Sequence, residues 1–394
     1  MSNILETLKE KFDQAEKALN GSVPEVLHQA RQNAMQQVLE NGLPGKKIET
    51  YKYTDVTKAL GKFEGTTLLG KSNVSKLSSP ALKGVNELVF INGTYSPEHS
   101  TLVSPSSELK ILTLNEAPEK DKALFDSYYG KIAGKENDAF VALNTAFSTG
   151  GVVIHIAKNA RPIPVLIRHI TDTTKGEGIS YSRNLVVAEP FSESILLEQF
   201  EGSANNEYFL NSLSEVHVDV NAHIRWHKLQ NNPKASQIDQ MSVYQGKASR
   251  FDLTTLTTEG HVIRNNVRIA VDGEGCETHL YGLYLANGTS HIDNQTSVDH
   301  IQPHSESNEL YKGILDDKSR GVFNGKVYVR KEAQKTNAFQ SNKNILLSDN
   351  ATVNTKPQLE IWADDVKCSH GCTTGQIDKE ALFYLRSRGL SEEM

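Results

Sequence analysis

About two hundred consecutive residues of short β-prone runs, with hardly a helical stretch among them, most constrain how this chain can fold. The runs start near Val152 and continue to about Val353, and Gly, Asn and Asp separate them. Many of the runs alternate apolar and polar residues. They are Val152–Ile156, Val165–Ile170, Leu185–Ala188, Ile195–Leu197, Val216–Val220, Ile224–Leu229, Leu253–Thr258, Val262–Val271, His279–Leu285, Val322–Val329 and Ile345–Leu347.

Two architectures fit this pattern, a β-sandwich and a solenoid of stacked coils. Hairpin signals of the Asn-Gly type are few, which speaks against a sandwich built from many hairpins. Asn-rich spots at Asn265–Asn266, Asn337 and Asn342–Asn344 suit stacked turns whose amides bond to neighbouring coils. We therefore favour a mainly β fold with a parallel β-helix core, although no strict repeat period is visible.

The flanks of this core have a different character. Apolar residues spaced by three and four predict an amphipathic helix over Met1–Asn20. A second helix is expected to start at Ser22 as its cap and to reach about Asn41. Further on, Leu88–Ile91 predicts a buried strand and Ala139–Phe147 a short helix. We divide the chain into a helical or mixed domain (1–150), a β-helix core (151–355) and a C-terminal segment (356–394).

The charge and the cysteine count exclude some functions. The chain of 394 residues has 42 basic and 48 acidic residues, a net charge of −6, which argues against binding nucleic acid through bulk charge. Three cysteines suit reduced thiols in a cytoplasmic protein. Charges interrupt the first helix, and no run of about 18 apolar residues occurs, so neither a signal peptide nor a membrane span is expected.

The strongest chemical signal is Cys368-Ser-His370-Gly-Cys372. We expect a last strand over Leu359–Ala363, a Gly-containing turn that carries the two thiols and the imidazole, and then a short helix capped by Asp378 and ended by Gly389. Backbone amides and Lys367 would favour thiolate there.

These soft donors suit iron, zinc or copper. Three donors do not complete a closed tetrahedral site, so Cys368, His370 and Cys372 would form part of a shared or transient metal site. The alternative is an inert buried turn.

Other patterns carry less weight. Gly65–Ser72 satisfies the phosphate-binding loop pattern letter for letter, but no buried strand precedes it and a poor helix follows, so we expect no ATP on this chain. His223, Arg225 and His227 share one face of a predicted strand, for which a solvated face is the simpler interpretation. Cys276 is expected to be a small buried residue.

A denser polar group between residues 291 and 304 has two interpretations. It could line a metal or catalytic site, or it could serve turn chemistry around Pro303. Its members are His291, Asp293, Asp299, His300 and His304. A related alternative is a carbohydrate-active β-helix lyase or hydrolase, which needs positioned carboxylates. The candidate acids for that activity are Asp293, Asp299, Asp316 and Asp317.

Several long, separated and collinear stretches carry a family likeness. They are Tyr51–Asp55, Leu143–Ala146, His291–Asn294, Gly313–Lys326, Ala333–Ala338, Asp364–Gly371 and Leu382–Gly389. Through them the sequence resembles the SufB/SufD family of iron–sulfur cluster assembly scaffolds, and its SufD branch more than its SufB branch.

This resemblance implies a right-handed parallel β-helix core, a helical N-terminal domain and a helical C-terminal segment. It also implies a non-catalytic scaffold that pairs with a SufB-like subunit and docks a SufC-like ABC ATPase. A nascent cluster would form between the two scaffold subunits, so iron or a cluster would be shared transiently and no cofactor would be bound stably.

Within this family pattern, His370 and Cys368 match residues at the interface between the subunits. Cys372 departs from the pattern, because the family usually has a small residue such as Ala there. The family also continues past Gly389 into further helices, so the SufC-docking surface is expected to be incomplete here. A third hypothesis is a homodimeric interaction module with pairing edge strands, and we expect a homodimer when the SufB-like partner is absent.

Overall fold

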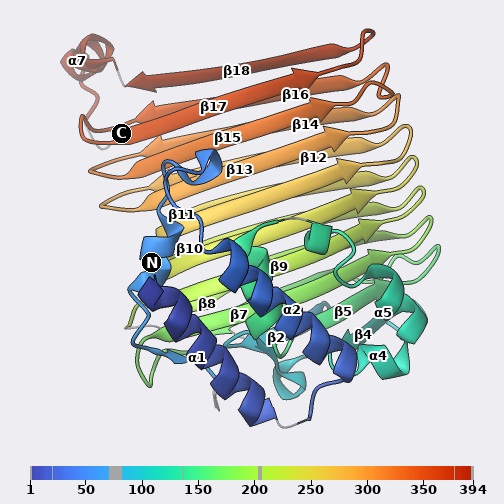
Figure 1. Ribbon diagram of the computed structural model, residues 1–394. Helices are drawn as coiled ribbons and strands as arrows, with labels where there is room; N and C mark the ends of the chain where they lie inside the picture. The colour runs from blue at the N-terminus through green and yellow to red at the C-terminus, as the bar shows by residue number, and fades with distance from the viewer. Residues whose placement is uncertain are drawn as a thin grey trace.

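The computed structural model describes residues 2–19, 21–70, 82–135, 137–202, 206–376 and 378–391. Strands hold 47% of the residues and helices 20%, so the chain is mainly β, as predicted. The strands stack into a solenoid of about eight turns, with helices at the N-terminus and one short helix near the C-terminus (Figure 1). The prediction of a parallel β-helix core is confirmed.

The solenoid is flattened, and each turn contributes one strand, or half of a long bent strand, to each of two parallel sheets. The strands are β1 (Thr67–Leu68), β2 (Asn86–Ile91), β3 (Thr94–Tyr95), β4 (Leu109–Thr113), β5 (Val152–Ile156), β6 (Val165–Thr171), β7 (Gly178–Ala188), β8 (Glu193–Gly202), β9 (Tyr208–Val218), β10 (His223–Gln245), β11 (Arg250–Val271), β12 (Glu277–Ala286), β13 (His291–His300), β14 (Glu306–Leu315), β15 (Arg320–Val329), β16 (Asn337–Leu346), β17 (Thr352–Ile361) and β18 (Lys367–Gln376).

The length of a coil varies along the stack. Glu277 of β12 lies beside Glu306 of β14, which lies beside Asn337 of β16, which lies beside Lys367 of β18. The successive offsets are therefore 29, 31 and 30 residues. Because insertions fall in the turns between strands, the register within each sheet is kept while the spacing in the sequence drifts, which hides the repeat.

Side chains that alternate along each strand point into the solenoid, where they form its core. Much of this core is apolar, as at Trp226, Leu253 and Leu280, which lie side by side on successive coils. Polar residues also enter it. The Asn265 amide donates to Asn294 Oδ1 at 3.0 Å, inside the stack. The expectation of Asn-rich turns is wrong, because Asn265 and Asn266 lie within β11, and Asn337 and Asn342–Asn344 lie within β16.

The N-terminal helices lie against the outer face of the lower coils (Figure 1). The α-helices are α1 (Ser2–Leu19), α2 (Glu25–Asn41), α3 (Val56–Gly61), α4 (Ala117–Lys120), α5 (Lys122–Tyr128), α6 (Ala139–Phe147) and α7 (Lys379–Ser387), and the 3-10 helices are η1 (Glu49–Tyr51), η2 (Pro97–His99) and η3 (Ala133–Lys135). Apolar residues of α1, α2 and α6 pack on Ile179, Phe209 and Ile238 of β7, β9 and β10.

Most local predictions for this region are confirmed. The first helix, the strand at Leu88–Ile91 and the helix Ala139–Phe147 all form where they were expected. The expected cap at Ser22 is wrong, because α2 begins at Glu25 and Pro24 takes the capping position without a side-chain hydrogen bond. Proline there presets the backbone angle for helix entry.

The Cys368–Cys372 segment corrects the sequence-based expectation. It is no turn but part of β18, the last strand of the stack, which pairs in parallel with β16. The β-helix therefore continues beyond residue 355 to Gln376. After it, Asp378 caps α7 by accepting from the Glu380 and Ala381 amides, as predicted.

Candidate functional site

The three candidate metal ligands lie on one side of the terminal strand. Cys368, His370 and Cys372 alternate along β18 and pair with Ala338, Gln340 and Asn342 of β16. All three partner residues are buried inside the solenoid. Paired residues of an in-register parallel sheet point to the same side, so the thiols and the imidazole face the solenoid interior at its open end.

Among the described residues, no further coil stacks on β18 at the open end. Every residue of the strand is exposed except Cys368, which is half-buried. Cys368 packs against a small apolar cluster that includes Val329 and Ala338. Burial raises the pKa of the Cys368 thiol above its ordinary value, more than the Ala338 backbone hydrogen bond lowers it. The expectation that the surroundings favour thiolate is therefore wrong for Cys368.

The donors do not converge within the chain. The Cα atoms of alternate residues of a strand lie about 6.6 Å apart, a spacing that side chains can bridge, but the thiols and the imidazole are not drawn together on β18. Within the described residues, no group of three His, Cys, Asp or Glu side chains is arranged to hold a metal ion. A complete site at β18 would therefore need further donors from outside the described residues.

Two polar side chains that the sequence analysis did not single out lie directly behind His370. Gln340 is its paired neighbour, and Glu309 of β14 is in turn the paired neighbour of Gln340. Both are buried, and the Gln340 amide donates to Glu309 Oε2 at 2.9 Å. Burial raises the pKa of Glu309 to about 7. The sequence signal that could have found them is a polar residue at an inward-facing position one coil, about thirty residues, before the Cys368–Cys372 motif.

The polar group between residues 291 and 304 is not brought together. His291 bonds Thr54 Oγ1 at 2.8 Å on the outer face, whereas His300 points inward to Ser307 Oγ at 2.9 Å. Burial lowers the pKa of His300 to about 4. His304 lies in a turn with a φ of 63°. These residues therefore serve separate structural contacts and do not form a common site.

The four candidate acids of a carbohydrate-active enzyme are also engaged separately. Asp293 forms an ion pair with the buried Arg264 at 2.5 Å, and Asp299 binds Arg330 through both carboxylate oxygens at 2.8 Å. Asp316 and Asp317 lie in the turn after β14, where they accept backbone amides. This arrangement gives no support to a pair of catalytic carboxylates.

The outer face of β10 agrees in part with its predicted solvated character. Arg225 and His227 are exposed, but the His223 ring donates to Asp252 Oδ2 at 2.6 Å. His279 contacts the other oxygen of Asp252 at 2.7 Å. The two imidazoles, together with Arg250, hold the pKa of Asp252 far below its usual range, against the opposing effect of its burial.

The remaining motifs have structural surroundings. Cys276 is buried, as expected, with its thiol close to the Gly246 and Gly273 carbonyls. The phosphate-loop pattern Gly65–Ser72 follows helix α3, and no buried strand precedes it, while its last two residues lie outside the described residues.

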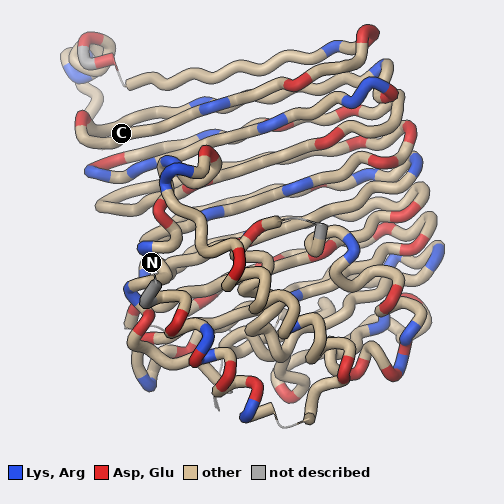
Figure 2. Tube along the Cα trace, in the orientation of Figure 1, with Lys and Arg blue, Asp and Glu red and all other residues tan. Residues whose placement is uncertain are grey.

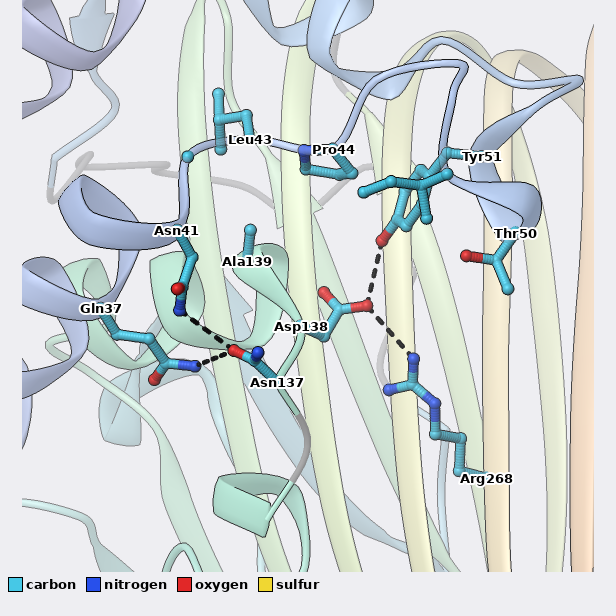
Figure 3. Close-up of a pocket in the computed structure, with 12 residues that line it drawn as sticks. Gln37, Asn41, Leu43, Pro44, Thr50, Tyr51, Asn137, Asp138, Ala139 and Arg268 are labelled. Atoms are coloured by element: carbon cyan, nitrogen blue, oxygen red, sulfur yellow. Dashed lines mark hydrogen bonds and ion pairs between the residues drawn. The ribbon is translucent and has the colours of Figure 1, made fainter.

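A cavity of about 540 Å³ lies between the N-terminal domain and the β-helix (Figure 3). Its centre is Asp138, whose carboxylate accepts from the Tyr51 hydroxyl at 3.0 Å and from Arg268 at 3.2 Å. Gln37 and Asn41 donate to Asn137 on another wall. These groups satisfy one another and tie the two domains together, and none of the β18 donors lines this cavity.

Charge is distributed unevenly along the stack. Lysine, arginine and acidic residues occur on most coils, but β18 has only one charged residue, Lys367 (Figure 2).

Among the described residues, no helix combines the length and the apolar character needed to span a membrane.

Comparisons with known proteins agree with this arrangement. Residues 2–164 match the model of the SufBD protein N-terminal region, and residues 169–394 match that of the SUF system FeS cluster assembly SufBD core domain. An iron–sulfur cluster assembly SufBD family protein of Synechocystis is 31% identical over 98% of this chain and 87% of its own length. Iron–sulfur cluster assembly protein SufD of Escherichia coli is 31% identical over 93% of this chain and 84% of its own length. A chloroplastic Arabidopsis thaliana protein is 27% identical over 99% of this chain and 83% of its own length.

Proposed function

The chain belongs to the SufBD family of iron–sulfur cluster assembly proteins, and on this premise we propose that it is a non-catalytic scaffold subunit whose open end is completed by a SufB-like subunit. The nascent cluster, or the iron from which it is built, is the cargo of this interface. Cys368 and His370 are this chain's contribution to it, and Cys372 extends the same row of donors.

One observation carries the proposal: a row of thiol, imidazole and thiol lies on an uncovered terminal strand. An exposed edge strand presents unpaired N–H and C=O groups and invites pairing with another chain. Natural proteins usually guard such an edge with charges, yet β18 carries only Lys367. An edge that is both unguarded and rich in soft donors is suited to a partner that brings the missing donors.

The chemistry of the donors supports a shared site. Neutral imidazole and thiolate are the ligands that iron and iron–sulfur clusters take from proteins. Because the pKa of Cys368 is raised, its thiol stays protonated until iron or a partner's positive charge displaces the proton. Cluster binding at this end would therefore be coupled to assembly of the two subunits and would be transient in this chain alone.

A second partner would dock at the C-terminal helix. Phe383 of α7 is 74% exposed, and Tyr384 and Leu385 beside it are exposed as well. Exposed aromatic side chains are typical anchors of protein interfaces. We assign this surface to a SufC-like ABC ATPase. That ATPase hydrolyses the ATP, and no ATP binds to this chain.

The three cysteines, all free, suit a reducing compartment such as the cytoplasm.

Co-expression with SufB-like and SufC-like subunits tests the proposal. The three proteins should co-purify, and the His370→Ala complex should retain its subunits but lose most of the iron and sulfide of the wild-type complex. His227→Ala is the matched control, because His227 is exposed on the outer face of β10. Unchanged iron and sulfide in the His370→Ala complex would remove this residue from the cargo site.

A further inference from the structure

An inward-facing column of three polar residues ends at the candidate site. Glu309, Gln340 and His370 are paired neighbours on β14, β16 and β18, and they follow Leu280 of β12 in the same column. The apolar column thus becomes polar only in the last three coils. A buried carboxylate and a buried amide are costly in a core, so their place behind His370 calls for a reason.

We propose that Gln340 accepts a hydrogen bond from the His370 imidazole and so orients it, and that Glu309 holds the Gln340 amide in the orientation this requires. The inference rests on the proposed function only in naming iron as the cargo that the oriented ring receives. Gln340 and Glu309 are positioning residues, because they act on the cargo through His370.

The Gln340 side chain is held on two sides. Its amide donates to Glu309 Oε2, and it lies against the backbone of Gly325 on β15 across the interior. A Cβ atom at residue 325 would come within 2.2 Å of the Gln340 amide nitrogen, so the glycine there leaves room for the amide in this position. The amide is therefore wedged between two strands and one carboxyl group.

The remaining acceptor of Gln340 is unused. Its Oε1 atom is buried and has no hydrogen-bond partner within the described residues. A buried carbonyl without a donor costs about 1–3 kcal/mol, which is uncommon in native structures unless a partner is still to come. The nearest inward-facing side chain toward the open end is His370, whose ring N–H groups can serve as that donor.

Glu309 can hold the Gln340 amide in one orientation in either of its protonation states. Its carboxyl accepts from Gln340 and from Thr296 Oγ1, both at 2.9 Å, and in the described part of the chain no cation pairs with it. A carboxyl group keeps an acceptor oxygen whether it is ionised or protonated, so the bond from Gln340 survives both states. Glu309 thereby keeps the amide nitrogen occupied and the amide oxygen available.

The consequence for His370 is a defined tautomer. When one ring nitrogen donates to Gln340, the other bears the lone pair and faces the uncovered end of the stack. Ligating histidines commonly have such a fixed acceptor behind them, and loss of that acceptor lowers metal affinity about 10- to 100-fold. Without Gln340 the exposed imidazole would sample both tautomers and several rotamers.

The tautomer of His370, read from the ring-nitrogen chemical shifts of ¹⁵N-histidine-labelled protein, tests the inference on the full chain and on its complex with the partners. The wild-type ring should hold one tautomer, whereas Gln340→Met should give a mixture of both, because the acceptor behind the ring is lost. The Fe²⁺ affinity under anaerobic conditions should fall about tenfold or more in the same variant.

Matched variants separate positioning from a general loss of packing. Gln230→Met removes another buried glutamine, which bonds Asn265 and Thr257 several coils away, and should leave both His370 readouts unchanged. Glu309→Gln keeps an acceptor for the Gln340 amide and should retain the single wild-type tautomer of His370. Glu309→Leu removes that acceptor and should reproduce part of the Gln340→Met effect.

A His370 tautomer distribution that is the same in Gln340→Met and wild type, in both the free chain and the complex, overturns the inference. Failure of the proposed function looks different: Fe²⁺ affinity and the iron and sulfide content of the complex would then be the same in His370→Ala and wild type. In that event the tautomer comparison in the free chain still decides whether Gln340 orients the ring.

Discussion

The two ends of the solenoid are built from the same kind of strand but finished differently. At the first coil, every residue of β2 is buried, and Leu88 and Phe90 have no exposed surface. The chain covers this end itself, with β3 and β4 pairing antiparallel to β2 and β5. At the last coil, every residue of β18 except Cys368 is exposed, and no further strand of the described residues is stacked beyond it (Figure 1).

Comparing the two ends separates the features of the open end that stabilise the fold from those that do not. The first coil is closed by two short antiparallel strands, whereas β18 presents donors of which only Cys368 packs against a core cluster. The other strand of the last coil, β17, carries Pro357 and Lys356, and both residue types disfavour unwanted strand pairing. The middle of β18 has neither a proline nor a lysine. The end is thus left open along the strand that holds His370.

The largest expected change in the free energy of unfolding comes from a substitution at the closed end. Phe90→Ala removes a ring that packs on Tyr95 and His169 inside the main core, and it should lower the free energy of unfolding by about 3–5 kcal/mol. Leu359→Ala is the counterpart at the open end, where the side chain is only half-buried, and its cost should be clearly smaller. Urea unfolding followed by circular dichroism measures both. Equal costs would show that the two ends are packed alike in solution.

The second prediction concerns Glu309 and pH. Its folded pKa of about 7 lies above the unfolded value near 4.5, so the folded state binds the extra proton between these values. Stability should therefore fall as pH rises from about 4.5 to 7, by about 3 kcal/mol from this group alone. The difference in unfolding free energy between wild type and Glu309→Gln isolates this contribution. A difference that does not change across this pH range would contradict it.

The third prediction addresses self-association of the open end. A lysine in place of Cys372 puts a charge on the exposed inner side of β18 and should weaken a homodimer formed there by tenfold or more. Thr254→Lys, on the exposed outer face of β11, is the control and should leave association unchanged. Light scattering over a concentration series measures this. A wild-type chain that is monomeric at micromolar concentration would exclude the homodimer.

Sequence patterns describe the closed end better than the open one. The helix Ala139–Phe147 and the strand around Leu88–Ile91 were predictable because apolar side chains with a clear period face a core. Cys368–Cys372 has no such period, because at the end of the stack there is no core to face. Its strand conformation is imposed by pairing with β16, which lies about thirty residues earlier, and local sequence does not report that partner.

The sequence alone did not reveal the role of Gln340 and Glu309, for a related reason. Gln340 and Glu309 sit at inward positions that propensity assigns to apolar side chains, so only the register between coils shows that they form one column with His370. The donor types at residues 368–372 were visible in the sequence. Their incomplete arrangement, and the raised pKa of Cys368, depend on burial that only the stacked coils define.

The smallest expected effect is on stability and is also the most informative about the open end. His370→Ala should lower the free energy of unfolding of the isolated chain by no more than about 1 kcal/mol, because the imidazole is exposed and water at the open end can replace its hydrogen bond to Gln340. A residue that serves packing, such as Phe90, loses stability and function together on truncation. His370 should lose only the iron and sulfide of the assembled complex. Measuring unfolding and cluster content on the same preparations separates the two cases, and a destabilisation of His370→Ala above about 2 kcal/mol would assign the residue to the architecture of the last coil instead of its cargo.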